Sequence, residues 1–176
     1  MSYLVNPYLV SAPCVDKIWD QTDGSTQVDW NSNMRGNANN VGTGNAYIGT
    51  TITSFKIELK ETGGTSDVPM YFGVWASGNN DQENPTAVFT GSIDNYNDLT
   101  TSFTWYTFTG SRTLVYDDHI GFCVNSAAPN IKQSRAENVA EGTIPNSSFT
   151  ARAASNPNWW NYNAGQILNM EVYQTC

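Results

Sequence analysis

Alternation of hydrophobic and polar side chains is the clearest pattern along the chain, and residues 51–61 display it best. In this stretch, TITSFKIELKE, the apolar residues Phe55, Ile57 and Leu59 alternate with charged residues. A period of two residues is the signature of a β-strand with one buried face and one face in water. We therefore predict a strand over residues 51–61 with one face in the protein core.

A second predicted strand, residues 68–77, is apolar on both of its faces. Its sequence, VPMYFGVWAS, puts Phe72 on one face and Tyr71 and Trp75 on the other. A strand with apolar side chains at both parities is covered on both sides. We expect this strand to be covered on both sides by the fold or to lie under a loop.

Aromatic residues are concentrated in SFTWYTFTGSRTLVYDDHIGFCV, residues 102–124. Phe103 and Trp105 share one parity along the strand. Tyr106 and Phe108 share the other. A β-bulge between the two pairs would direct all four side chains to the core, because a bulge inserts one extra residue into the strand. We therefore predict a bulged strand that crosses the core of a two-sheet sandwich.

The same alternation predicts the inward-facing residues of two later strands, which are Ile120, Phe122 and Val124 in one and Leu168, Met170 and Val172 in the other, residues 167–175. Shorter strands are expected over residues 15–19, 25–30, 46–49, 86–93, 130–135 and 148–153.

About ten short strands separated by turn-forming residues, without helical periodicity, indicate an all-β fold. The expected architecture is an antiparallel two-sheet β-sandwich of the jelly-roll type. We expect a single jelly-roll domain over residues 15–176, preceded by an extended N-terminal arm over residues 1–14. Residues 31–45 and 153–165 are expected to be long loops, which are either functional or without fixed structure.

Charge narrows the choice of partners. The chain has 16 acidic residues against 8 Lys and Arg, a net charge of −8, which opposes binding to phosphate backbones. We therefore expect no nucleic acid as a partner. No apolar run approaches the roughly 20 residues that span a bilayer, and the N-terminal segment lacks the pattern of a signal peptide. We expect no membrane insertion.

Three segments resemble a known family. They are TTITSFKIELKETGG, GSIDNYNDLTTSFTWYTFTGSRTLVYDDHIGFCV and the closing ILNMEVYQ. They look like a widespread family of small jelly-roll modules found in archaeal and bacterial extracellular proteins and in virion proteins. The likeness covers residues 46–125 and the last strand, and the chain departs from it at Gln166, where the family has Asp. The resemblance implies a jelly-roll fold and a non-enzymatic role in carbohydrate binding or adhesion.

No common catalytic motif is present, since the chain lacks G-x-S-x-G, P-loop and H-E-x-x-H sequences. His119 is the single histidine, and it stands beside a predicted turn at Asp117 and Asp118, where we expect a surface position. We therefore predict that the protein is not an enzyme. A glycosidase, which would use two of the acidic residues as a carboxylate pair, is the distant alternative.

A candidate calcium loop is DQTDGST, residues 20–26. Asp20 and Asp23 offer the hard oxygen ligands that Ca²⁺ prefers. Asp-Gly is also a hairpin signal, and a plain turn is the favoured interpretation. We therefore expect no cofactor, with Ca²⁺ at these two aspartates as the alternative.

The segment NPNWWNYN, residues 156–163, sets aromatic rings among asparagines. Aromatic rings stack on the C–H faces of sugars, and amide groups pair with hydroxyls. The candidate ligand-binding residues are Asn158, Trp159, Trp160, Asn161 and Tyr162. The alternative is that a tryptophan plugs the end of the sandwich.

The N-terminal segment YLVNPYLVSAP is too apolar for a free tail and too interrupted by proline for a core helix. As an arm it would add a strand to the sheet edge of a neighbouring subunit, and the alternative is that it folds back over its own sandwich. The apolar arm residues are Tyr3, Leu4, Val5, Tyr8, Leu9 and Val10. Cys14 and Cys176, near the two ends, are either bridged or free, while Cys123 is expected to be a buried thiol.

These observations favour a virion surface protein, such as a capsid decoration, fibre or spike component. It would assemble as a homo-oligomer with other virion proteins and contact cell-surface glycans of the host. The alternative is a carbohydrate-binding or adhesion module of a secreted or cell-surface protein. The expected location is a virion surface, or otherwise the extracellular space.

Overall fold

The computed structural model describes residues 15–21, 26–29, 34–63, 68–124, 131–136, 147–153, 156–163 and 167–175. These residues form two antiparallel β-sheets that pack on each other as a β-sandwich. The all-β, two-sheet prediction is therefore confirmed, while the jelly-roll connection of the strands stays a prediction. Among the described residues, the single helical element is a short 3-10 helix, η1 (Tyr96–Asp98).

Sheet A contains eight strands, which are β1 (Val15–Gln21), β2 (Thr26–Asp29), β4 (Thr51–Glu61), β7 (Thr90–Gly91), β8 (Thr104–Thr113), β10 (Ile131–Ala136), β13 (Ile167–Leu168) and β14 (Met170–Thr175). Sheet B contains six strands, which are β3 (Met34–Val41), β5 (Met70–Trp75), β6 (Ala87–Val88), β9 (His119–Val124), β11 (Ser147–Ala153) and β12 (Asn156–Asn163). In the described ranges, a helix with the length and apolar character to cross a membrane is absent.

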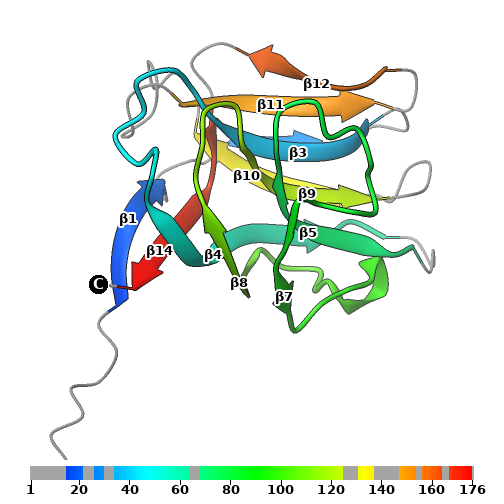
Figure 1. Cartoon of the computed structure of the whole chain (residues 1–176). Helices are drawn as coiled ribbons and strands as arrows, with labels where there is room; N and C mark the ends of the chain where they lie inside the picture. The colour runs from blue at the N-terminus through cyan, green and yellow to red at the C-terminus, as the bar shows by residue number, and fades with distance from the viewer. Residues whose placement is uncertain are drawn as a thin grey trace, which may run out of the picture.

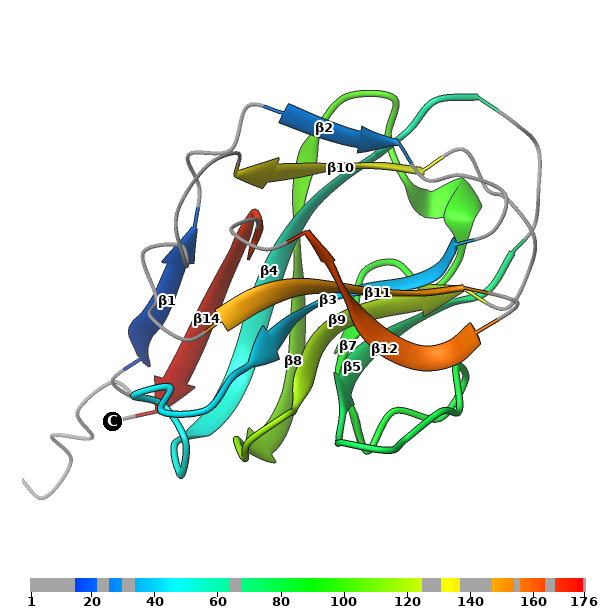
Figure 2. The ribbon, with the colours of Figure 1, turned by 90° about the horizontal axis from the view of Figure 1, so that it is seen from above.

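β4 and β9 are the central strands of sheets A and B. In sheet A, β4 pairs with β14, β8 and β10, and in sheet B, β9 lies between β3 and β5. β1 forms one edge of sheet A, and β12 and β6 form the two edges of sheet B. Figure 1 shows β12, β11, β3, β9 and β5 in sequence across the molecule, and Figure 2 shows β1, β14 and β4 side by side in the other sheet.

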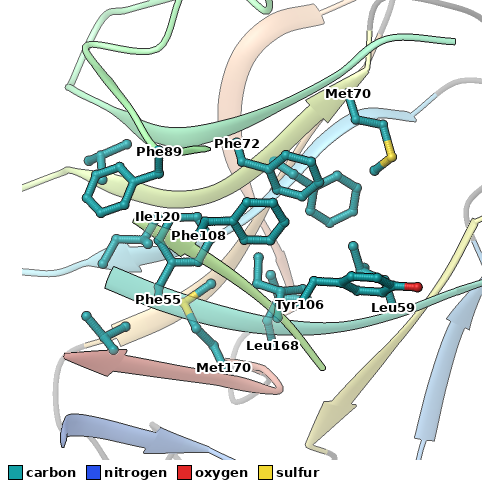
Figure 3. Close-up of a cluster of buried hydrophobic side chains, with 14 of the residues drawn as sticks. Phe55, Leu59, Met70, Phe72, Phe89, Tyr106, Phe108, Ile120, Leu168 and Met170 are labelled. Atoms are coloured by element: carbon teal, nitrogen blue, oxygen red, sulfur yellow. The ribbon is translucent and has the colours of Figure 1, made fainter. Parts of the chain in front are cut away.

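Aromatic and branched side chains fill the space between the sheets (Figure 3). Phe72 from β5 stacks on Phe108 from β8 with 3.8 Å between the ring centroids, so this contact joins the two sheets directly. Phe55 lies 5.4 Å from Phe108 and 5.2 Å from Phe89. The predicted inward residues of β4, β9 and β14 are all buried, as their alternation predicts.

The predicted bulge within the aromatic run of β8 is wrong. Tyr106 and Phe108 are buried, whereas Trp105 lies opposite Glu58 and is only partly buried. The register shift between β8 and β4 falls instead beside Ile52. The aromatic residues of one parity suffice to fill the core, and those of the other parity cover the outer face of sheet A.

Residues 31–45, expected to be a loop, contain β3. The sequence of β3, MRGNANNV, has no apolar alternation, yet Asn39 is fully buried. Its side-chain carbonyl accepts from the Leu168 N–H at 2.7 Å, and its amide donates to the Leu168 carbonyl at 3.3 Å. The strand therefore depends on hydrogen bonds to the opposite sheet and on ladders with β9 and β11, which hydrophobic periodicity does not detect.

Three other expectations need correction. Residues 46–49, expected to be a strand, form turns. Residues 86–93 divide into β6, which joins sheet B, and β7, which joins sheet A. Residues 156–163, expected to lie within a loop, form the edge strand β12. An edge strand needs pairing on one side only, so a polar sequence is compatible with it.

Candidate functional site

The chain crosses from one sheet to the other between β6 and β7. β6 pairs with β5 in sheet B, and β7 pairs with β8 in sheet A. The Phe89 N–H donates to the Phe72 carbonyl at 3.0 Å, and the Met70 N–H donates to the Asp94 carbonyl at 2.8 Å. Between these two bonds the chain leaves the edge of β5 and returns to it. A cavity of about 460 Å³ lies beside this segment, residues 89–94.

The cavity has an apolar floor and a more polar rim. The buried lining residues are Met70, Phe72, Phe89 and Ile93. The exposed or half-buried lining residues are Pro69, Tyr71, Glu83, Pro85, Val88, Thr90, Gly91, Asp94 and Asn95. An apolar base with a few polar groups around it is the usual composition of a small-molecule site.

One wall of the cavity is the loop between β5 and β6, which packs on β5 at Gly73. A side chain at Gly73 would place its Cβ 2.3 Å from the Ala87 carbonyl oxygen and 2.8 Å from the Pro85 Cβ, so this close approach requires glycine. The Trp75 indole N–H also holds the loop by donating to the Asp81 carbonyl at 2.7 Å. Two contacts with a buried strand therefore fix this wall.

The opposite wall is held by a capping box at η1. The Asn95 side chain accepts from the Asn97 N–H at 3.1 Å, and the Asp98 carboxylate accepts from the Asn95 N–H at 3.1 Å. The Tyr96 ring is buried, and its hydroxyl donates to the Glu61 carboxylate at 3.1 Å. These bonds fix the backbone on this side of the cavity.

Tyr71 brings an aromatic ring and a hydroxyl to the cavity. Burial, the charge and hydrogen bond of Glu83, and the charge of Asp81 together raise the pKa of the Tyr71 hydroxyl, so the phenol is neutral at physiological pH. Glu83 and Asp94 are the charged residues of the lining, and within the described residues no Lys, Arg or His lines the cavity. The two carboxylates therefore accept hydrogen bonds from a ligand, and they give the cavity a negative electrostatic potential.

The ligand-binding residues predicted from the sequence lie on β12, at the edge of sheet B opposite to β6. Asn158 is exposed and Trp159 is half-buried. The Trp159 ring stacks on His119 with 4.9 Å between centroids and lies 5.7 Å from the Trp75 ring, so it covers the outer face of sheet B. The side chains of three further predicted residues lie outside the described part of the structure, namely Trp160, Asn161 and Tyr162.

His119, expected at the surface, is only 4% exposed, because the stacked ring of Trp159 covers it. Its Nδ1 lies 3.1 Å from the Thr150 hydroxyl, and its Nε2 lies 3.6 Å from the Asp117 carboxylate. A hydroxyl, an imidazole and a carboxylate in this order suggest a nucleophile with its base. Thr150 is only 2% exposed, however, and its hydroxyl donates to a backbone carbonyl at 3.2 Å. A buried hydroxyl that already donates to the backbone does not fit an exposed nucleophile.

The proposed calcium ligands are not brought together in the described residues. Asp20 lies in β1, where its carboxylate is 2.7 Å from the Lys17 ammonium, and Asp23 is outside the described residues. In the ranges given above, no three His, Cys, Asp or Glu side chains are placed to hold a metal ion. Cys123 is buried, as predicted. The remaining predicted residues also lie outside the described ranges, namely Tyr3, Leu4, Val5, Tyr8, Leu9, Val10, Cys14 and Cys176.

Comparisons with protein-family models, curated proteins and solved structures give no match to the chain. The resemblance to small jelly-roll modules therefore stays an expectation from the sequence. Tyr71, Glu83 and Asp94, which line the cavity, are not among the candidate site residues that the sequence predicts. The available signal is weak, since it consists of a strand with aromatic residues on both faces followed by the acidic loop GNNDQENP.

Proposed function

We propose that this protein is a non-enzymatic recognition protein that binds carbohydrate in the cavity beside residues 89–94. The observation that carries the proposal is the lining, where the Tyr71 ring stands with the polar groups of Glu83, Asp94 and Asn95 beside an apolar floor. A sugar combines C–H faces that pack on rings with hydroxyls that donate and accept hydrogen bonds. The volume of about 460 Å³ suits a short saccharide, because small-molecule sites measure roughly 300–1,000 Å³.

The exposure of the two carboxylates favours binding over glycoside hydrolysis. A glycosidase needs one carboxyl group that stays protonated and acts as general acid, which burial in apolar surroundings usually provides. Glu83 and Asp94 are both exposed, and Glu83 is hydrogen-bonded with Tyr71. Carboxylates in this position are suited to accept hydrogen bonds from sugar hydroxyls.

The proposed setting is a virion surface, where the protein forms homo-oligomers with other virion proteins and contacts host glycans. The apolar N-terminal segment supports assembly, and the net charge of −8 opposes nucleic-acid binding. A carbohydrate-binding module of a secreted or cell-surface protein would use the same cavity. Mass measurement in solution separates the two settings, because a stable oligomer is expected of the first and a monomer of the second.

Tyr71→Ala tests the site. We expect the affinity for the best saccharide on a glycan array, remeasured by titration calorimetry, to fall by about tenfold or more, because the ring that stacks on the sugar is lost. Tyr71→Phe keeps the ring and should lose less. Tyr116→Ala is the matched control, because Tyr116 is 58% exposed and does not line the cavity.

Two outcomes would contradict this proposal. Unchanged saccharide affinity in Tyr71→Ala, with a wild-type melting temperature, would exclude the cavity as the binding site. Release of new reducing ends from an oligosaccharide incubated with the wild-type protein would contradict the non-enzymatic role. Thermal melts of all three variants separate loss of binding from loss of folding.

A further inference from the structure

We infer that the cavity selects sugars that carry a free amino group over their neutral N-acetylated counterparts and over acidic sugars. This inference deepens the proposed function and depends on it. The chemical class is an amino sugar with a protonated amine, and the residues that would recognise the ammonium are Asp94, Glu83 and the Tyr71 ring.

The charge of the lining is of one sign. Glu83 and Asp94 carry carboxylates, and in the described part of the chain no Lys, Arg or His side chain lines the cavity. The loop that forms one wall adds Asp81, whose charge, like that of Glu83, contributes to the raised pKa of the Tyr71 hydroxyl. Burial is the largest cause of that raised pKa, and the negative charges of Glu83 and Asp81 add to it. These two charges attract a cation near the hydroxyl and repel an anion.

Hydrogen bonds of its backbone hold Asp94 in place, and its carboxylate takes no part in them. Its carbonyl accepts from the Met70 N–H at 2.8 Å, and its N–H donates to the Asp98 carboxylate at 3.3 Å. Among the described residues, the Asp94 side chain makes no hydrogen bond or ion pair, and it is exposed at the rim. A ligand ammonium can pair with it without first breaking a bond inside the protein.

Tyr71 supplies the second contact that an ammonium prefers. Its ring is half-buried, and its hydroxyl interacts with Glu83, which orients the side chain at the cavity. An ammonium over an aromatic face is attracted by the ring quadrupole, most strongly where water is partly excluded. The apolar floor excludes water from one side of the cavity. A uronic or sialic acid would meet the carboxylates without a compensating cation.

The test compares three probes by titration calorimetry at pH 6, where carboxylates are ionised and the sugar amine is protonated. The probes are a glucosamine oligomer, the N-acetylglucosamine oligomer of equal length and a uronic acid oligomer. We expect the wild-type protein to bind the amine form about tenfold more tightly than the N-acetylated form, since a charge-assisted bond is roughly twice as strong as a neutral one. Binding of the uronic acid form should be undetectable.

Two variants test whether Asp94 causes the preference for the amine probe. Asp94→Asn keeps the shape of the side chain and removes its charge, so it should reduce the preference for the amine about threefold or more while retaining binding of the N-acetylated probe. Asp16→Asn, an exposed carboxylate on β1 and outside the cavity lining, changes the net charge equally and should keep the wild-type preference.

The outcomes separate this inference from the proposed function. Equal affinity for the amine and N-acetylated probes, both reduced by Tyr71→Ala, would overturn the inference and leave carbohydrate binding intact. A preference that persists in both Asp94→Asn and Glu83→Gln would also overturn it. If none of the three oligomers binds and no saccharide on the array binds, both the inference and the proposed function are wrong.

Discussion

Phe108 lies at the centre of the contact between the two sheets. Its ring is fully buried and stacks on Phe72 from the opposite sheet, 3.8 Å away. Both residues are labelled in the core close-up of Figure 3. Phe103, five residues earlier in the same aromatic segment, points to the opposite face and is only partly buried. The Lys60 ammonium lies 4.5 Å from the centroid of its ring. Two phenylalanines of one segment therefore have different energetic roles.

Phe108→Ala is expected to lower the free energy of unfolding by about 3–5 kcal/mol, because it removes an aromatic side chain from a packed core and leaves a cavity. Urea denaturation measures the loss. Phe103→Ala is the matched control and should cost about 1 kcal/mol or less. A loss below about 1 kcal/mol for Phe108→Ala would mean that the sheets do not pack on this ring.

Arg112 and Asp118 form a two-bond ion pair between β8 and the turn before β9. The Arg112 Nε and Nη2 donate to the Asp118 carboxylate at 3.0 and 2.7 Å, and these bonds raise the pKa of Arg112. The carboxylate is fully buried and also accepts from the Val115 N–H at 3.0 Å. A buried carboxylate without its guanidinium keeps one backbone bond and loses its charge partner.

We expect Arg112→Met to lower the free energy of unfolding by about 3 kcal/mol, because it leaves the Asp118 charge buried without a cation. Arg112→Lys retains a charge but not the two-bond geometry, and it should lose less. Thermal and urea denaturation give both values. Equal stability of Arg112→Met and the wild-type protein would mean that the pair contributes nothing to the fold.

At the scale of elements, Glu171 of β14 links its two neighbouring strands. Its carboxylate lies 3.0 Å from the Lys17 ammonium of β1 and 3.0 Å from the Lys56 ammonium of β4. Burial alone would raise its pKa, but the hydrogen bond from Tyr173 and the bonds from both lysines outweigh burial and lower the pKa of Glu171 to about 2. The ionised carboxylate of Glu171 therefore stabilises the folded state.

This shift predicts an acid-dependent loss of stability. The folded-state pKa of about 2 is below the ordinary value of 4.5, so the contribution of Glu171 is complete above about pH 4.5 and is lost as the pH falls toward 2. We expect about 1–2 kcal/mol, because both lysines are partly exposed and solvent screens the pairs. Urea denaturation at pH 6 and pH 2.5 gives the wild-type loss, and Glu171→Gln should lose less over the same interval. Identical losses in the two proteins would contradict the prediction.

At the scale of the whole molecule, the described strands leave one edge of sheet A open. β1 pairs with β14 alone among the described strands, and it begins at Val15, directly after the predicted arm of residues 1–14. An open edge presents unpaired backbone groups that an added strand can bond. Residues 1–14 lie outside the described ranges, and the arm hypothesis is tested by deletion.

Deletion of residues 1–12 is expected to abolish oligomers while the sandwich stays folded. Light scattering measures the mass, and a thermal melt confirms the fold. A full-length control with Leu4→Glu and Leu9→Glu keeps the length of the arm and removes its apolar character, and it should also be monomeric. Normal assembly of the truncated chain, or its failure to fold, would contradict the arm hypothesis.

The sequence alone determines the fold class and most of the strands. In β4, Phe55, Ile57 and Leu59 alternate with charged residues, and each of the three is buried as predicted. A strand's alternation is a local property, because successive side chains point to opposite faces whatever else the chain does. The same reasoning correctly places Phe122 of β9 and Val172 of β14 in the core.

Only the tertiary structure decides the polar strands and the cavity. β3 is held by ladders on both sides and by the bonds of Asn39 to the opposite sheet, and these partners are distant in sequence. Tyr71, Glu83 and Asp94 line one cavity because the chain crosses between the sheets after β6 and returns to β5 just before η1. Periodicity describes which face a residue occupies along its own strand. It carries no information on which segments the crossing brings together, and that crossing forms the cavity.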